Sequence, residues 1–152
     1  MRIVFLAFVV LCLASCGEKP YTETYMSFDD HTWRADVPLV SKFDVQDTTK
    51  FYDFLFTLRH GQDYAYSNLF IFVEVSFPNG RSLIDTLECV LADQSGRWLG
   101  NGIGDLVDHR ILLNEKRMFP IKGPYELTIT QAMRDSELKG VYDVGFSLEN
   151  TK

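Results

Sequence analysis

The sequence is poor in cysteine, in positive charge and in helical periodicity, and each shortage excludes a class of protein. Only three cysteines occur among 152 residues, so a disulfide-rich scaffold is excluded. The formal net charge is −6 and the pI is near 5.0, which argues against a nucleic-acid partner, since that requires a basic face. Beyond residue 15, no stretch of about a dozen residues repeats its apolar positions with the period of a helix.

Motifs of common catalytic and metal sites are also missing. There is no Gly-x-Ser-x-Gly elbow, and the glycine-rich run from Gly96 to Gly104 lacks the ending of a phosphate-binding loop. His31, His60 and His109 are far apart in the sequence, and none has a second histidine at the spacing of a zinc site. We therefore predict a protein that is not an enzyme and that has no cofactor and no metal.

The N-terminus has the features of a lipoprotein signal peptide. Arg2 precedes an apolar run, Ile3 to Leu13, which has the length of a signal h-region and is too short to span a membrane. The run ends in small residues before Cys16, which resembles the cleavage site of bacterial lipoprotein precursors. That resemblance implies cleavage before Cys16 and its acylation with chains such as palmitate, which anchor by apolar burial.

Removal of this segment sets the domain boundaries that we predict. Residues 1–15 are the signal peptide, residues 16–27 a polar tether, and residues 28–152 a single domain. Cys89 is then the only cysteine without a lipid. It lies on the same face of its predicted strand as the neighbouring leucines, so we expect Cys89 to be a small buried apolar residue.

Two stretches at the centre of the chain have the period of half-buried strands. Tyr52, Phe54, Phe56 and Leu58 occupy every second position and so lie on one face of a strand. The segment from Leu69 to Phe77 likewise has apolar residues at every second position. We expect these stretches to form a central strand pair, and we expect Met133 to Lys139 to form at most one helical turn. Short strands separated by turn signals predict an all-β fold, an antiparallel β-sandwich of seven to nine strands, either immunoglobulin-like or jelly-roll.

Several phrases in order resemble a known family. They are Phe51-Tyr52-Asp53-Phe54, Leu58-Arg59-His60, Tyr64-Ala65-Tyr66-Ser67-Asn68-Leu69, Gly96-Arg97-Trp98-Leu99-Gly100, and Met133-Arg134 with Leu138, Gly140, Val144 and Gly145. Behind a lipoprotein signal, this set resembles the gliding-motility lipoproteins of Bacteroidetes known as GldH. The resemblance implies a cell-envelope lipoprotein of the gliding apparatus and its associated secretion system, with other envelope proteins as partners and no catalytic set.

Six residues are candidates for contact with a partner or ligand. Arg59 and His60 form a cationic pair at a strand end, which would hold a carboxylate or equally bond Asp63 or a loop carbonyl. Amphipathic aromatic side chains and amides are common at interfaces and sugar sites. The remaining candidates are Tyr64, Tyr66, Asn68 and Trp98.

Three alternatives stay open at this point. Aromatic loop residues on a sandwich would also suit an envelope glycan-binding module. Asp93, Asn101 and Asp105 offer oxygen ligands for calcium, although their spacing matches no known loop. The membrane, inner or outer, is undetermined, but only Glu18 is acidic directly after Cys16. We therefore favour a domain that faces the periplasm, because surface-exported lipoproteins of this phylum have an acidic stretch there.

Overall fold

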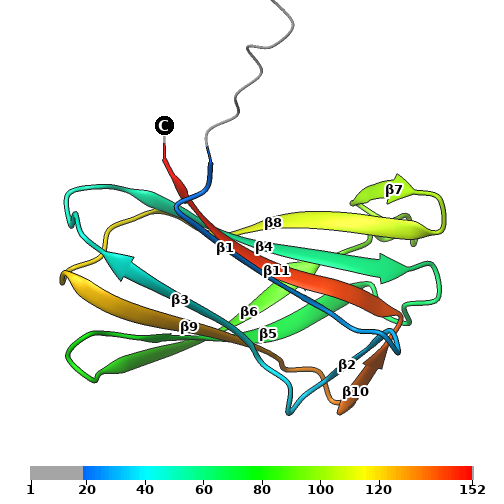
Figure 1. Cartoon of the computed structure of the whole chain (residues 1–152). Coiled ribbons are helices and arrows are strands. Elements are labelled where there is room, and N and C mark those ends of the chain that lie inside the picture. The colour runs from blue at the N-terminus through cyan, green and yellow to red at the C-terminus, as the bar shows by residue number, and fades with distance from the viewer. Residues whose placement is uncertain (1–18, 152) are drawn as a thin grey trace, which may run out of the picture.

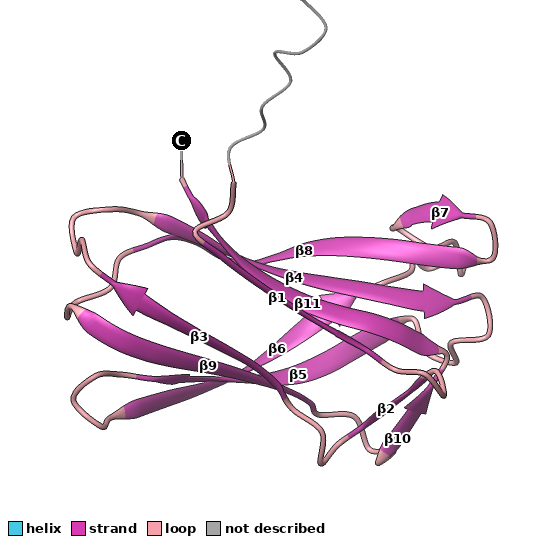
Figure 2. Ribbon diagram, in the orientation of Figure 1, coloured by secondary structure: helices cyan, strands magenta, loops and turns pink. Residues whose placement is uncertain are grey.

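The computed structural model describes residues 19–151, which form an all-β sandwich of two packed sheets (Figures 1 and 2). The larger sheet has the strand order β1-β11-β4-β8-β7, the smaller has the order β3-β9-β5-β6, and β10 pairs with β2 in a short ribbon. The strands are β1 (Thr22–Ser27), β2 (Thr32–Arg34), β3 (Leu39–Val45), β4 (Tyr52–Gly61), β5 (Asn68–Ser76), β6 (Ser82–Val90), β7 (Asn101–Ile103), β8 (Leu106–Arg117), β9 (Gly123–Gln131), β10 (Glu137–Lys139) and β11 (Val141–Asn150).

Every strand pairing is antiparallel, so the predicted antiparallel β-sandwich is confirmed. The described residues hold eleven strands rather than seven to nine, because β2, β7 and β10 are additional short strands of three residues each. Such short segments carry too few residues for a period of two to be recognised in the sequence.

Alternation of apolar and polar side chains places the core between the two sheets. In β3 every second residue is buried, and β9 follows the same rule from Tyr125 to Gln131. Tyr52, Phe56 and Leu58 of β4 are at most 1% exposed and belong to the core, as predicted from their shared parity. Cys89 is also buried, as predicted.

The predicted central strand pair is wrong. β4 pairs with β8 and β11 in one sheet, whereas β5 pairs with β6 and β9 in the other. Each strand has one apolar face, and two such faces can meet across a core as well as side by side in a sheet. The period alone does not distinguish these arrangements, and residues 62–67 provide enough chain to cross between the sheets.

Two further boundaries differ from prediction. Thr22–Ser27, expected in the tether, form β1, because Thr22, Thr24 and Met26 turn inward while the residues between them are exposed. Glu137–Lys139, expected near a helical turn, form β10 against β2. The turn Pro78-Asn79-Gly80 connects β5 to β6, and Gly80 has a φ of 78°, a value that favours glycine.

The sandwich has two ends of different composition. We call the end with loops 46–51, 77–81 and 118–122 the basal end and the opposite one the distal end. Residues 19–21 and Thr151 both lie at the basal end, where the amide of Thr151 donates to Phe51 O and that of Tyr21 to Leu148 O (Figure 1). The predicted signal peptide and Cys16 lie outside the described residues, and no helix within residues 19–151 is long and apolar enough to cross a bilayer.

Candidate functional site

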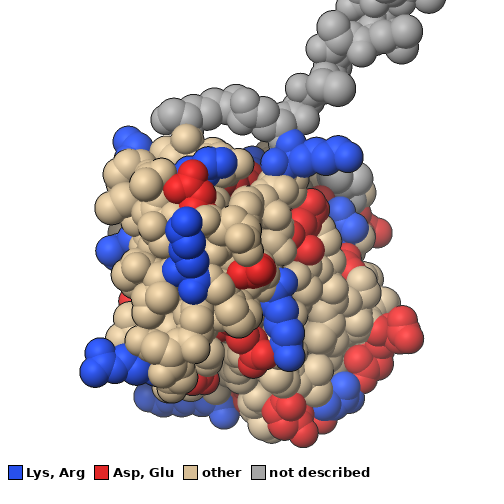
Figure 3. Space-filling model, turned by 60° about the vertical axis from the view of Figure 1, so that its left-hand side comes forward, with Lys and Arg blue, Asp and Glu red and all other residues tan. Residues whose placement is uncertain are grey.

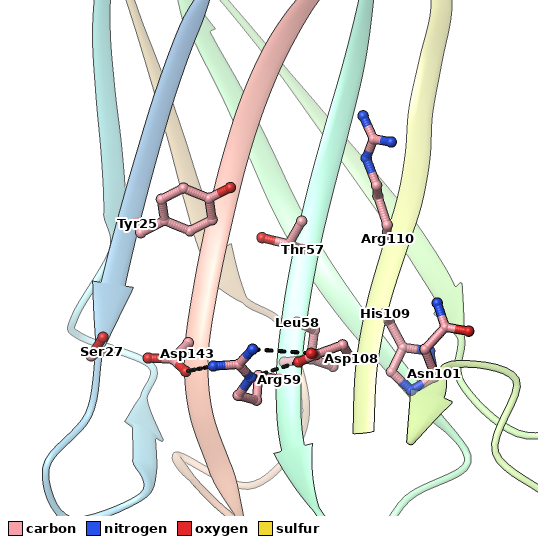
Figure 4. Close-up of a pocket in the computed structure, with 10 residues that line it drawn as sticks. All are labelled: Tyr25, Ser27, Thr57, Leu58, Arg59, Asn101, Asp108, His109, Arg110 and Asp143. Atoms are coloured by element: carbon pink, nitrogen blue, oxygen red, sulfur yellow. Dashed lines mark hydrogen bonds and ion pairs between the residues drawn. The ribbon is translucent and has the colours of Figure 1, made fainter. Parts of the chain in front are cut away.

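A groove of about 480 Å³ crosses the outer face of the larger sheet (Figure 4). It is lined by side chains of five neighbouring strands, among which Tyr25, Arg59 and Arg110 are large and exposed. Because side chains of a strand alternate between faces, the same strands send their apolar residues to the core. The groove is therefore lined mainly by polar side chains, with the Tyr25 ring among them, and the sheet supports it.

Arg59 is fixed at the distal end of this groove by two carboxylates. Its Nε and Nη2 atoms donate to the two oxygens of Asp108 at 2.6 and 3.0 Å, and Nη1 donates to Asp143 at 3.4 Å (Figure 4). Asp108 and Asp143 lie on the strands to either side of β4, directly opposite Arg59. The hydrogen bonds from Arg59 lower the pKa of Asp108. Arg59 is thus engaged within the chain and does not present a free cation.

Tyr25 lies flat over the backbone of β11 because the residue opposite it is a glycine. Gly145 pairs with Tyr25, and a Cβ at position 145 would collide with the Tyr25 ring and with Oγ1 of Thr57. The ring thereby covers the gap that the missing side chain leaves, an arrangement known to stabilise glycines in sheets. Tyr25 remains 58% exposed, and hydrogen bonding with Glu23 raises its pKa to about 12. The result is an aromatic surface beside Arg59.

The Gly145→Val substitution is expected to displace Tyr25 and to lower the free energy of unfolding by about 2 kcal/mol, the usual cost of overpacking. Denaturant unfolding of the purified domain would measure this change. The same substitution at Gly102, which has open space around it and no positive φ, is the control. Equal stability of the two variants would contradict the role given to the Tyr25 ring.

A second cluster lies inside the distal end of the sandwich. His60 and His109, on adjacent strands, face each other with a distance of 3.0 Å between their Nε2 atoms, and both side chains are buried. Nδ1 of His60 lies 2.7 Å from Gly61 O, which makes His60 the acceptor in the pair and His109 the donor. Burial lowers the pKa of both groups, that of His109 to about 4. Both rings are therefore neutral at pH 7.

Aromatic rings close around this histidine pair. The His60 ring packs edge-on against Trp98, with centroids 4.5 Å apart, and lies 5.1 Å from the ring of Tyr64. Trp98 Nε1 donates to Gln62 Oε1 at 2.9 Å, which holds the loop before β7 against the loop after β4. Tyr64 is 4% exposed, and burial raises its pKa. These residues hold the distal loops together.

The six predicted contact residues all lie at the distal end, but they do not form one surface. His60, Tyr64 and Trp98 come together in the buried cluster, whereas Arg59 points to the opposite side of β4. Tyr66 and Asn68 are half-buried, as Trp98 is. Tyr66 donates a hydrogen bond to Asp135, and Asn68 Nδ2 donates to Glu88 Oε1 at 2.7 Å.

The sequence does not indicate several residues of these sites. Tyr25 lies in the predicted tether, and Gly145 is only part of a family motif. The inward position of His109 is predictable from the sequence. Val107, His109 and Ile111 occupy every second position of β8 and face the core, just as His60 does in β4. Of the three oxygen ligands considered for calcium, Asp93 accepts hydrogen bonds from Ser95 and Arg97 within its own loop.

The fold and these sites define a class, an all-β sandwich domain with a polar groove on one sheet and aromatic loops at one end.

Residues 20–148 match the family described as GldH lipoprotein. The chain is 36% identical over 151 residues to a gliding motility lipoprotein GldH homolog of Christiangramia forsetii, covering 95% of this chain and 92% of that protein. It is 33% identical to the gliding motility lipoprotein GldH of Flavobacterium johnsoniae, covering 95% and 93%.

The chain belongs to the GldH lipoprotein family, so the predicted resemblance is confirmed. Membership in this family implies a membrane-anchored envelope protein. Among solved structures, TmCBM61 in complex with beta-1,4-galactotriose aligns with 89% of this chain and 99% of its own, at 12% identity and a TM-score of 0.37. A likeness of that degree supports no functional argument.

Proposed function

We propose that the chain is a non-enzymatic, lipid-anchored component of the gliding apparatus and its associated secretion system, which acts by binding other envelope proteins. The observation that supports this most is the arrangement of the two ends. Residues 19–21 lead from the predicted lipid site into the basal end, while Tyr66, Trp98 and the loops around them lie at the distal end. The domain would thereby present its aromatic loops to partners and keep its base near the membrane.

Crosslinking in cells tests the contact surface directly. A photo-reactive amino acid at Ala65, an exposed residue between Tyr64 and Tyr66, should capture gliding or secretion components. The same group at Lys42, exposed on the outer face of the smaller sheet, is the control and should not capture them. Capture of only this protein or of abundant lipoproteins at both positions would contradict the proposal.

The lipid anchor makes a separate prediction. The Cys16→Ala substitution should abolish membrane attachment and the ability to restore gliding to a deletion strain, because acylation supplies about 0.8 kcal/mol per buried methylene. Motility plates and cell fractionation would measure these effects. Full restoration of gliding by the unlipidated protein would show that the anchor is dispensable.

The groove beside Tyr25 supports a second candidate function, the binding of an envelope glycan. An exposed aromatic ring beside polar side chains is an arrangement that suits sugar rings, and it adds a second aromatic surface to the predicted one at Tyr64, Tyr66 and Trp98. Calorimetric titration with envelope and dietary polysaccharides, repeated with Tyr25→Ala, tests it. No heat of binding across the panel would exclude this function.

A further inference from the structure

The loops at the two ends of the sandwich carry opposite charge. Outside the strands, the basal end has four cations and one anion, for a formal charge of +3: Lys19, Lys50, Arg81, Lys122 and Asp47. The loops of the distal end have seven anions and two cations, for a formal charge of −5: Asp29, Asp30, Asp36, Asp63, Asp93, Asp105, Asp135, Arg97 and Arg134. The charge of this acidic protein is thus strongly polarised along its strands.

The basal cations are available to an outside partner. Lys19, Lys50, Arg81 and Lys122 are all exposed, and none forms an ion pair with any residue between positions 19 and 151. Figure 3 brings this end forward and shows Lys and Arg side chains spread over it, with Asp and Glu among them.

Two anions near this end, Asp47 and Asp53, accept hydrogen bonds within the chain. Asp47 accepts hydrogen bonds from Thr49, which lower its pKa. Asp53 accepts from the amide of Lys116 and from Thr151 Oγ1. With Asp47 still counted as an anion, the loops of this end keep a net formal charge of +3.

The chain length fixes which surface this end can meet. Six Cα-to-Cα steps separate Cys16 from Thr22, which allows a reach of about 20 Å at most. The strands themselves are longer, since the twelve residues of β8 extend about 40 Å. A lipid on Cys16 would therefore hold the basal end, and not the distal end, within reach of the bilayer.

We propose that the basal end docks on the anionic phospholipid headgroups of the bilayer that holds the lipidated Cys16; the inference rests on the anchor in the proposed function. Lys50, Arg81 and Lys122 face the phosphates, while Phe51 and Met118, which are 47% and 53% exposed, enter the headgroup layer. Docking orients the strands away from the membrane, and the acidic distal loops are repelled from the same anionic surface.

Spin labels at two glutamines test this in the mature lipoprotein. Gln46→Cys places a label on an exposed basal residue, and Gln94→Cys places one on an exposed distal residue. Cys89 would not react, because it is buried and burial raises its pKa to about 11. Collision with a water-soluble nickel chelate is compared in nanodiscs of phosphatidylcholine and in nanodiscs of equal parts phosphatidylcholine and phosphatidylglycerol.

We expect the anionic lipid to protect the label at position 46 severalfold and to leave the label at position 94 unchanged. Each cation near an anionic surface favours docking about fivefold, so the triple variant Lys50→Gln/Arg81→Gln/Lys122→Gln should lose the protection. A variant with the same loss of charge elsewhere, Lys42→Gln/Arg134→Gln/Lys139→Gln, is the control and should retain it.

Two outcomes would overturn the proposal, and they differ in meaning. Equal accessibility at position 46 in both kinds of nanodisc, or equal effects of the two triple variants, would contradict docking while leaving the anchor intact. An unacylated mature protein, detected by its intact mass, would contradict both the anchor and the docking that depends on it.

Discussion

Acidification from about pH 7 to about pH 4 should lower the free energy of unfolding by about 3 kcal/mol through His109 alone. The unfolded chain takes up a proton near the ordinary histidine pKa of 6.5, whereas folded His109 remains neutral down to about 4. Between these values the unfolded state binds more protons, so stability falls as the pH falls. His60, whose pKa is also lowered by burial, adds to the loss in the same direction.

Urea unfolding at a series of pH values would measure this effect. The double variant His60→Leu/His109→Leu removes both partners of the hydrogen bond and should show a weaker loss in this window, because carboxylates with a lowered pKa, such as Asp108, lose their contribution mainly below about pH 4. His31→Gln removes an exposed histidine that stacks on Tyr142, and it is the control because it should preserve the full loss. Identical pH profiles for the wild type and the double variant would exclude a contribution from the pair.

The Trp33→Ala substitution should lower the free energy of unfolding by about 4 kcal/mol, since it empties a large buried site. Trp33 of β2 is 0% exposed and stacks against Phe28 and Phe56, so it closes the core between the sheets near their distal end. Its Nε1 atom donates to Val37 O at 2.9 Å, and the substitution would leave that carbonyl without its partner. A loss of this size is a large share of the stability of a domain.

Thermal and denaturant unfolding of the variant would measure the loss. Leu99→Ala is the control, because Leu99 is 55% exposed and its truncation removes little buried surface. A loss below about 1 kcal/mol for Trp33→Ala would mean that the distal ribbon packs loosely on the core.

The fold was largely predictable because it follows from local alternation. Tyr52, Phe56 and Leu58 indicate a strand and its buried face, and Asn79-Gly80 is typical of a hairpin turn. What alternation does not specify is the partner of each strand. β4 and β5 each present one apolar face, and the choice between one sheet and two is made by the total packing of β8, β9 and β11 against them.

The sites were less predictable because they are made by contacts between distant residues. Nothing near Arg59 in the sequence indicates Asp108 or Asp143, which meet it only through the register of three strands. Tyr25 was missed for a different reason. Thr22–Ser27 mix polar and apolar residues so evenly that the strand resembles a polar tether, and only the pairing with β11 identifies it.

The pairing of β1 with β11 also governs when the domain can fold. The first strand lies against the last, so the larger sheet cannot close until the chain as far as Leu148 is available to fold. Sandwiches built from such distant pairings fold in about milliseconds to seconds, far more slowly than helical domains. During that interval β11 presents an unpaired edge to any neighbouring chain. A newly made molecule is therefore vulnerable to aggregation until β1 and β11 meet, and a chaperone would be most useful at that stage.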